Sequence, residues 1–362
     1  MDTLASGRLV VSNPDRPSWP DGVQAEELFR LGALLEDGPE LFGEVRAVEL
    51  GPGGELYVLD SQASEIRVFG SDGRHQLTFG RSGEGPGELK EPAGMTLDSN
   101  DKLWVLNWGN GRYTAFDPSS GELHDERRRL ATFVSFPWPG SFDDTGRLVD
   151  LGLGRDGTPS ILRTDTLFVP IDTLDLPWPD ESNLIAFRRD GVTMMSSMEP
   201  FAPQPTWAPH PEGGIVVGEG GAYRLHRVGF DEDTTLTIVL DREPEVVTQA
   251  ERDSALQVFA EMSERAGGAT PDRQPRVRET KPLHGALFVA PDARIWVRGF
   301  SGAEGLSAWD LFSPAGRYLG QVAVPVRPSF VRAAVRDDRL AIVTEIEGVP
   351  TVVVYRLTVP DS

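Results

Sequence analysis

The sequence predicts an all-β protein built from repeated units of four antiparallel strands. Short apolar runs recur along the chain, separated by polar turns that contain Gly, Pro, Asn or Asp. The clearest unit, residues 80–116, has a glycine-rich loop followed by three strands that two such turns connect. The last unit lacks sequence for its fourth strand, whereas residues 28–31 are an outer strand without earlier strands of their own. We therefore expect both ends of the chain to meet in one sheet, which closes a ring and removes its free edge.

The spacing of the second strand gives the number of units. Six apolar second strands can be placed, and they begin at Leu56, Leu103, Leu148, Ile215, Ile295 and Leu340. Three of the intervals span 45 to 47 residues, and the other two span 67 and 80 residues. A four-stranded propeller blade takes roughly 40 to 50 residues, so each long interval contains an insertion. The prediction is a six-bladed β-propeller over residues 28–362, closed by the N-terminal strand, with insertions at 177–204 and 242–284.

Residues 1–27 precede this repeat as a polar, Pro-rich arm around one apolar run at 9–11. The arm is either loosely attached or adds an outer strand to the last blade.

Composition excludes several classes of protein. The 362-residue chain has no cysteine, so it has no disulfide and no thiolate ligand or nucleophile. A formal net charge of -21 argues against binding nucleic acid, which requires clustered Lys and Arg. No run approaches the roughly 18 apolar residues that a membrane helix needs. We expect an acidic monomer without a transmembrane segment.

Two sets of motifs resemble known families. Residues 92–107, PAGMTLDSNDKLWVLN, resemble the NHL repeat of six-bladed propellers. The stretches RLVVSNPDRPSW, GRSGEGPGEL and WDLFSPAGRYLG are similar to an uncharacterised group of bacterial six-bladed propellers, many made with an export or lipoprotein signal. This resemblance implies a periplasmic, cell-surface or extracellular location, with a leader that this chain lacks. It brings no known reaction with it.

The second insertion contains a predicted amphipathic helix. Thr248 and Glu251 form a capping box, and Gly267 ends the helix. The apolar stripe at helical spacing consists of Ala255, Val258, Phe259 and Met262. We expect this stripe to be buried on the propeller rim or to cover the channel. Both insertions lead from an outer strand to the next inner strand, so they should share one face.

The NHL resemblance implies that ligands bind where the inner strands enter the central channel. Aligning the blades places Arg46, Trp138 and Phe330 at this entrance, with His284 beside it. The second strands end at Asp60 and Asn107 in two blades, and we expect these residues to hold turns through backbone hydrogen bonds. Glu219 and Arg298 depart from that pattern. The candidate ligand-binding residues are Arg46, Trp108, Trp138, Glu219, His284, Arg298 and Phe330.

Function follows less directly than fold. The leading hypothesis is a ligand-binding or scaffold propeller of the bacterial envelope that takes a small molecule, glycan or peptide at the channel face. The alternative is a metal-assisted hydrolase or lyase in the channel. The related amidating lyases carry zinc-binding His residues at blade entrances, where this chain has Ala93 and Gly285. Calcium-dependent lactonases use carboxylates and Asn, a set that Asp60, Asn107 and Glu219 could imitate. No catalytic residue, cofactor or metal ligand is assigned, and calcium stays as the alternative.

Overall fold

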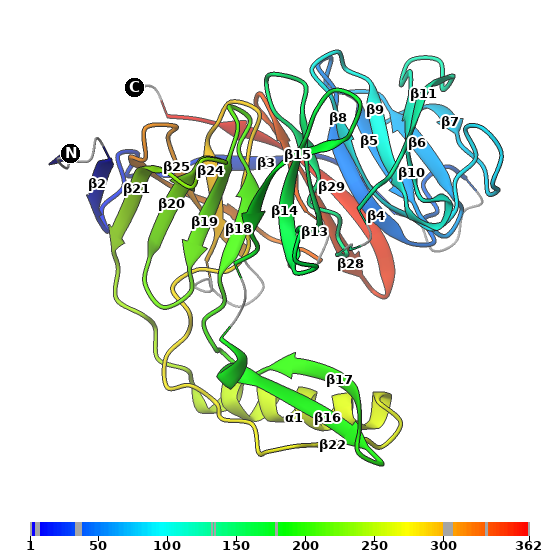
Figure 1. The fold of residues 1–362 in the computed structure, drawn as a ribbon. Coiled ribbons are helices and arrows are strands. Elements are labelled where there is room, and N and C mark those ends of the chain that lie inside the picture. Colours follow the sequence, from blue (N-terminus) through cyan, green and yellow to red (C-terminus); the bar gives the residue numbers. More distant parts are fainter. Residues whose placement is uncertain are drawn as a thin grey trace.

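The computed structural model describes residues 2–3, 8–32, 38–131, 133, 135–177, 180–299, 307–329 and 332–360. Six sheets, each built on four antiparallel strands, stand side by side in a ring, and a small separate unit projects from one face of that ring (Figure 1). The predicted all-β propeller of six blades is confirmed. Each predicted second strand begins at or within one residue of the expected position.

The first three blades are continuous in sequence, and each has four strands in chain order from the channel outward. Blade one consists of β4 (Val45–Leu50), β5 (Leu56–Asp60), β6 (Glu65–Phe69) and β7 (His75–Phe79). Blade two consists of β8 (Pro92–Leu97), β9 (Leu103–Asn107), β10 (Arg112–Phe116) and β11 (Leu123–Arg128). Blade three consists of β12 (Ser141–Phe142), β13 (Leu148–Leu153), β14 (Pro159–Thr164) and β15 (Pro170–Asp175).

The other three blades contain the insertions and the closure. Blade four consists of β18 (Thr206–Pro209), β19 (Ile215–Glu219), β20 (Arg224–Val228) and β21 (Thr234–Asp241). Blade five consists of β23 (Leu287–Val289), β24 (Ile295–Arg298), β25 (Ser307–Phe312) and β26 (Tyr318–Val324). Blade six consists of β27 (Ala334–Arg336), β28 (Arg339–Ile346), β29 (Val349–Thr358) and the N-terminal β3 (Gln24–Leu31).

The hydrophobic core lies between the blades. Each pair of neighbouring blades encloses one cluster of buried apolar side chains, including the pair formed by blades six and one. The strands read as apolar runs because both faces of most blades are covered by a neighbour. Burial of apolar surface therefore favours the closed ring over any open arc of blades.

Two of these interfaces also contain a buried Tyr–Asp hydrogen bond. Tyr113 of blade two donates to Asp150 of blade three, and Tyr223 of blade four donates to Asp310 of blade five at 2.6 Å. Arg129 compensates the charge of Asp150, and Arg242 compensates that of Asp310. A buried carboxylate is tolerated only with such partners, so these bonds favour one register between adjacent blades.

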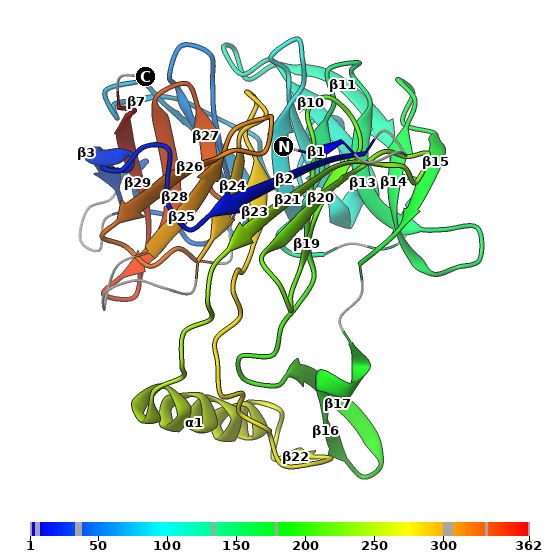
Figure 2. The ribbon, with the colours of Figure 1, turned by 90° about the vertical axis from the view of Figure 1, so that its left-hand side faces the viewer.

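Ring closure occurs as the sequence predicts. Strand β3 pairs antiparallel with β29, in a register that joins Leu31 to Val352 and Gln24 to Thr358. This strand begins at Gln24, four residues before the expected boundary. Strand β2 (Leu9–Pro14) takes a different place from the one expected on the last blade. It pairs in parallel with β21 of blade four and lies along its outer edge (Figure 2). A short strand, β1 (Asp2–Thr3), pairs with β2 in turn.

The two insertions fold together into one unit, which we call the inserted module. It consists of the 3-10 helix η2 (Glu181–Asn183), the hairpin β16 (Leu184–Arg189) and β17 (Val192–Met198), the helix α1 (Gln249–Arg265) and β22 (Thr270–Pro271). Both views show the module on connecting segments beside one face of the ring (Figures 1 and 2). The insertions therefore share a face, as their connections require.

Helix α1 has the predicted capping box and ends before Gly267. Its apolar stripe is not buried where we expected. Phe259 packs on Phe187 of the hairpin, with ring centroids 5.7 Å apart, and Ile185 and Ala269 complete this small core. The expectation of a helix on the rim or over the channel is wrong, because the first insertion provides the apolar surface that the stripe needs.

Candidate ligand site at the channel entrance

The channel entrance contains a cavity of about 220 Å³, which we call the entrance cavity. The loop before β12, strand β18, the start of β23, the end of β24, the first half of β25, and the loop before β27 contribute to it. Blades three to six thus surround the cavity. Its lining consists of Pro137, Trp138, Pro139, Trp207, Ala208, Pro209, Ala286, Leu287, Phe288, Arg298, Trp309, Pro328, Ser329, Arg332 and Ala333. None of these residues belongs to α1.

Three tryptophans give the entrance cavity its aromatic character. Trp138 is buried, and its indole N–H donates to Asp150, which fixes the ring. Trp309 is 4% exposed and contacts Phe288 edge-on at 5.2 Å between ring centroids. Its indole nitrogen has no hydrogen-bond partner in the described structure. Trp207 is half-buried on β18. Large rings held in this way offer flat apolar contact area with little loss of side-chain entropy on binding.

The charged groups in the lining are both arginines, and no Asp or Glu occurs among the described residues around the cavity. Arg332 forms an ion pair with Glu49 at 3.3 Å. Burial raises the pKa of Glu49, and the positive charges of Arg332 and Arg336 oppose this rise. The Arg298 guanidinium has no hydrogen bond or ion pair with any described residue. Burial, together with the nearby charge of Arg327, lowers the pKa of Arg298. An arginine nevertheless stays protonated at neutral pH.

Of the seven residues expected at this face, the structure brings Trp138 and Arg298 together in the entrance cavity. Phe330 lies outside the described residues. Arg46 forms an ion pair with Glu44 and lies 5.1 Å from the Phe136 ring centroid. The guanidinium carbon of the buried Arg129 lies 5.3 Å from the centroid of the Trp108 ring.

His284 and Glu219 meet each other at the boundary of blades four and five. The His284 ring is 2% exposed, lies 2.6 Å from the backbone oxygen of Glu219 and contacts Tyr223. Burial lowers the pKa of His284. The Glu219 carboxylate contacts His226 at 2.6 Å and Arg224 at 3.4 Å. Neither residue lines the entrance cavity.

Asp60 and Asn107 hold turns, as expected. The buried Asp60 carboxylate accepts hydrogen bonds from the backbone N–H groups of Gly43, Glu44 and Ala63. Asn107 is fully buried, and its amide oxygen accepts from the backbone of Lys90 at 2.8 Å. These oxygens already have donors, so they are poorly placed as calcium ligands. Among the described residues, no group of three or more His, Asp and Glu side chains is arranged to hold a metal.

Sequence reasoning missed Trp207, Trp309 and Arg332. The alignment compared the blade entrances and the ends of the second strands, whereas Trp309 is on a third strand. Antiparallel pairing places Trp309 directly opposite Arg298. A blade register extended to the third strand would have identified it.

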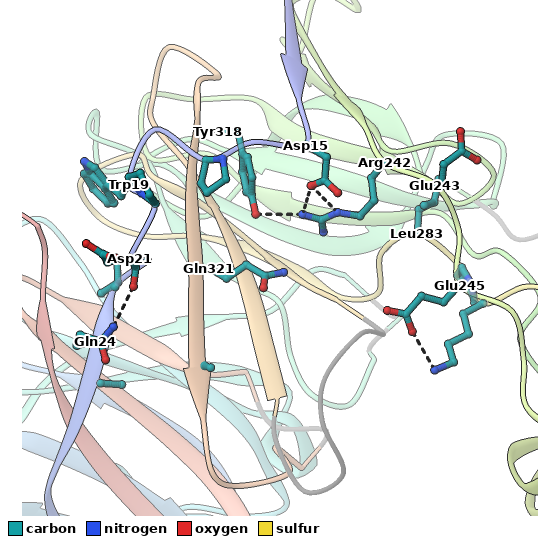
Figure 3. A pocket seen from close by; sticks show the side chains of 18 residues that line it. Asp15, Trp19, Asp21, Gln24, Arg242, Glu243, Glu245, Leu283, Tyr318 and Gln321 are labelled. Atoms are coloured by element: carbon teal, nitrogen blue, oxygen red, sulfur yellow. Dashed lines mark hydrogen bonds and ion pairs between the residues drawn. The ribbon is translucent and has the colours of Figure 1, made fainter.

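A larger cavity of about 630 Å³ lies outside the channel, where the connections of the inserted module leave the ring (Figure 3). Arg242 contacts Asp15 of the N-terminal arm at 2.8 Å and the buried Asp310 at 2.6 Å. Lys281 contacts Glu245 at 3.1 Å and Glu251 at 2.8 Å. Both cations are therefore neutralised by the chain itself. This network attaches the arm and the module to blade five, and we give the smaller entrance cavity more weight as a ligand site.

Comparison with known proteins agrees with this architecture. Residues 39–139 match the sequence model of a family described as "6-bladed beta-propeller". A solved structure from Bacteroides fragilis, described as a "Putative exported protein", has a TM-score of 0.52 at 14% identity, covering 97% of this chain and 100% of that chain. The chain is a six-bladed β-propeller. Its repeats are similar to NHL repeats, since 72 residues are 31% identical to human NHL repeat-containing protein 3.

The human match spans 19% of the propeller chain and 21% of the human protein's length. Virginiamycin B lyase from Staphylococcus aureus has a TM-score of 0.41 at 12% identity, covering 87% of this chain and 80% of that chain. No helix in the described parts of the propeller is both long and apolar enough to cross a membrane.

Proposed function

We propose that this propeller is a binding protein of the bacterial envelope that takes a small molecule, or one sugar or side chain of a larger ligand, in the entrance cavity. The observation that carries the proposal is the convergence, at one end of the channel, of three tryptophans and an arginine that has no partner among the described residues. Binding sites typically combine apolar and aromatic walls with a few polar groups that orient the ligand. The entrance cavity has this composition.

The size of the cavity limits what enters it. Cavities that enclose drug-sized ligands have volumes of about 300 to 1,000 Å³, whereas the entrance cavity has about 220 Å³. It would therefore enclose a group about the size of one aromatic ring system or one monosaccharide. A glycan or peptide would insert one such group and leave the rest on the propeller face.

An envelope location is part of the proposal. It is supported by the motifs shared with exported bacterial propellers and by the fold shared with a protein described as exported. No observation favours the alternative of a metal-assisted hydrolase, because the oxygens of Asp60 and Asn107 are engaged by backbone donors.

A blocking variant tests the site. Ala286 lines the cavity with an exposed side chain, so Ala286→Phe should fill the cavity without disturbing the core. The native protein would be screened by thermal shift against monosaccharides, dipeptides and small aromatic acids and amides, and hits would be titrated by calorimetry. We expect the hits to lose at least about tenfold in affinity in Ala286→Phe, at an unchanged melting temperature.

The matched control is Ala260→Phe, an equally large change at an exposed position of helix α1, which should leave affinity unchanged. Hits that bind Ala286→Phe as tightly as the native protein would contradict the proposed site. A screen that yields no hit in any of the three ligand classes would also contradict it.

A further inference from the structure

The charge of the entrance cavity points to a narrower class of ligand. We infer that the ligand is an organic anion, with a carboxylate that contacts Arg298 and an apolar, ring-sized body that contacts the tryptophans. This inference rests on the proposed function, since it assigns the ligand of the same cavity.

Arg298 has no counter-ion among the described residues, although the chain is rich in acids. The protein has 56 Asp and Glu residues against 35 Lys and Arg, and most arginines of the blades have a carboxylate nearby. Arg298 is half-buried and has none among the described residues. A partly desolvated cation is costly without a partner. An anionic ligand would supply that partner.

The charge around Arg298 is positive. Arg327 acts on Arg298 with a like charge, whereas the charge of Arg332 is compensated by Glu49. No carboxylate lines the described cavity. In a protein with a net charge of -21, this makes the entrance cavity a local exception that repels cations and attracts anions.

The hydrogen-bond donors of Arg298 suit a carboxylate. Arg298 and Trp309 face each other across β24 and β25, so the guanidinium and the indole ring occupy directly opposed positions. A guanidinium fork matches the two oxygens of a carboxylate. The indole N–H of Trp309 is buried and has no hydrogen-bond partner among the described residues, so we expect the guanidinium to supply the hydrogen bonds to the ligand.

The walls select the rest of the ligand. Trp138, Trp207 and Phe288 present rings, and four prolines add rigid apolar surface. Such walls exclude water from the arginine, and the electrostatic attraction for an anion is stronger where water is excluded. A hydrated inorganic anion would gain little from them. An aryl or alkyl carboxylate would use both features.

Three probes with the same ring test the inference: indole-3-acetate, indole-3-acetamide and tryptamine, titrated into the native propeller by calorimetry. They carry a negative, a neutral and a positive group. We expect the acetate to bind at least about tenfold more tightly than the acetamide, because a hydrogen bond to a charged group is stronger than a neutral one. Tryptamine should bind most weakly, because its ammonium group is repelled by Arg298.

Variants locate the effect. Arg298→Gln should remove the preference for the acetate and leave binding of the acetamide nearly unchanged. Arg317→Gln, at an exposed turn of the same blade, should preserve the preference. In spectra of the ¹⁵N-labelled protein, the indole resonance that disappears in Trp309→Phe should shift with the acetate.

The outcomes separate this inference from the proposed function. Equal affinity for acetate and acetamide, an acetate preference that survives Arg298→Gln, or no binding of any probe would overturn the anionic ligand. Binding of the probes that persists unchanged in Ala286→Phe would instead overturn the entrance cavity as the site.

Discussion

At the residue scale, His210 in blade four occupies a turn position that holds an Asp in two other blades. The hairpins between first and second strands are held by Asp98 in blade two and Asp143 in blade three, which accept backbone N–H bonds. His210 occupies the same position in blade four. It is 3% exposed, and its Nδ1 accepts from the backbone of Glu212 at 3.2 Å. The imidazole replaces a carboxylate that the other two blades use.

This substitution makes the stability of the propeller depend on pH. Burial, reinforced by the charge of Arg227, lowers the pKa of His210 from 6.5 to about 4. Between these values the unfolded chain binds a proton that the folded chain excludes, so stability is full above about pH 6.5 and falls as the pH drops toward 4. The loss should be on the order of 1 to 3 kcal/mol.

His210→Asn should flatten this dependence, because an amide oxygen can accept the same backbone hydrogen bond and does not titrate. Denaturant unfolding between pH 4 and pH 7 measures it, with the exposed His124→Asn as control. A native slope retained in His210→Asn would show that other groups cause it.

The same repeat logic explains which site residues could be predicted. Arg298 was found because it stands where Asp60 and Asn107 hold turns, and such a departure is visible in an alignment of blades. Glu219 was found in the same way, and His284 was found from its place beside the channel entrance, yet the structure pairs both with neighbours instead of exposing them to the cavity. Position in the repeat gives a location, whereas contacts with the next blade decide whether a side chain stays available.

At the scale of elements, the inserted module shows what the sequence could not reveal. Each insertion alone has too few apolar residues for a core, and blade four separates them in the chain. The capping box of α1 is local and was predictable. The partner of Phe259 is Phe187, about seventy positions earlier in the chain, and no periodicity connects them.

Phe259→Ala should destabilise the inserted module and leave the stability of the ring unchanged. Phe→Ala changes in cores cost about 3 to 5 kcal/mol, so residues 249–265 should exchange amide hydrogens about a hundredfold faster or more. Strands β9 and β24 should keep native protection, because they belong to different cores. Mass-spectrometric hydrogen exchange measures both regions in one experiment.

The control for that experiment is Leu256→Ala on the same helix, since Leu256 is 40% exposed and should contribute little. Equal loss of protection in β24 would mean that the module and the ring unfold as one unit.

At the scale of the whole molecule, most of the architecture could be predicted because a repeat constrains every blade at once. The spacing of six apolar strands gave the blade count, and the surplus strand at residues 28–31 gave the closure. The place of β2 could not be derived in this way. Its apolar run fits any open outer edge, and the pairing with β21 depends on the path by which the chain then passes blade five to reach β3 on blade six. Asn13 fixes that passage by accepting a hydrogen bond from the backbone of Tyr318 at 2.9 Å.

Truncation from the N-terminus should therefore destabilise the ring in steps. Removing residues 1–7 should change the melting temperature little. Removing residues 1–14 deletes β2 and exposes the edge of β21. Because blade four keeps its own four strands, we expect only a moderate decrease in melting temperature. Removing residues 1–31 also deletes β3, which leaves β29 unpaired, opens blade six and exposes part of the core between blades six and one. This last step should lower the melting temperature by at least about 5 °C beyond the second and promote aggregation through the open edge.

Scanning calorimetry with light scattering measures both effects. If the first two truncations cost as much as the third, the arm as a whole, and not the closure by β3, would be what stabilises the propeller.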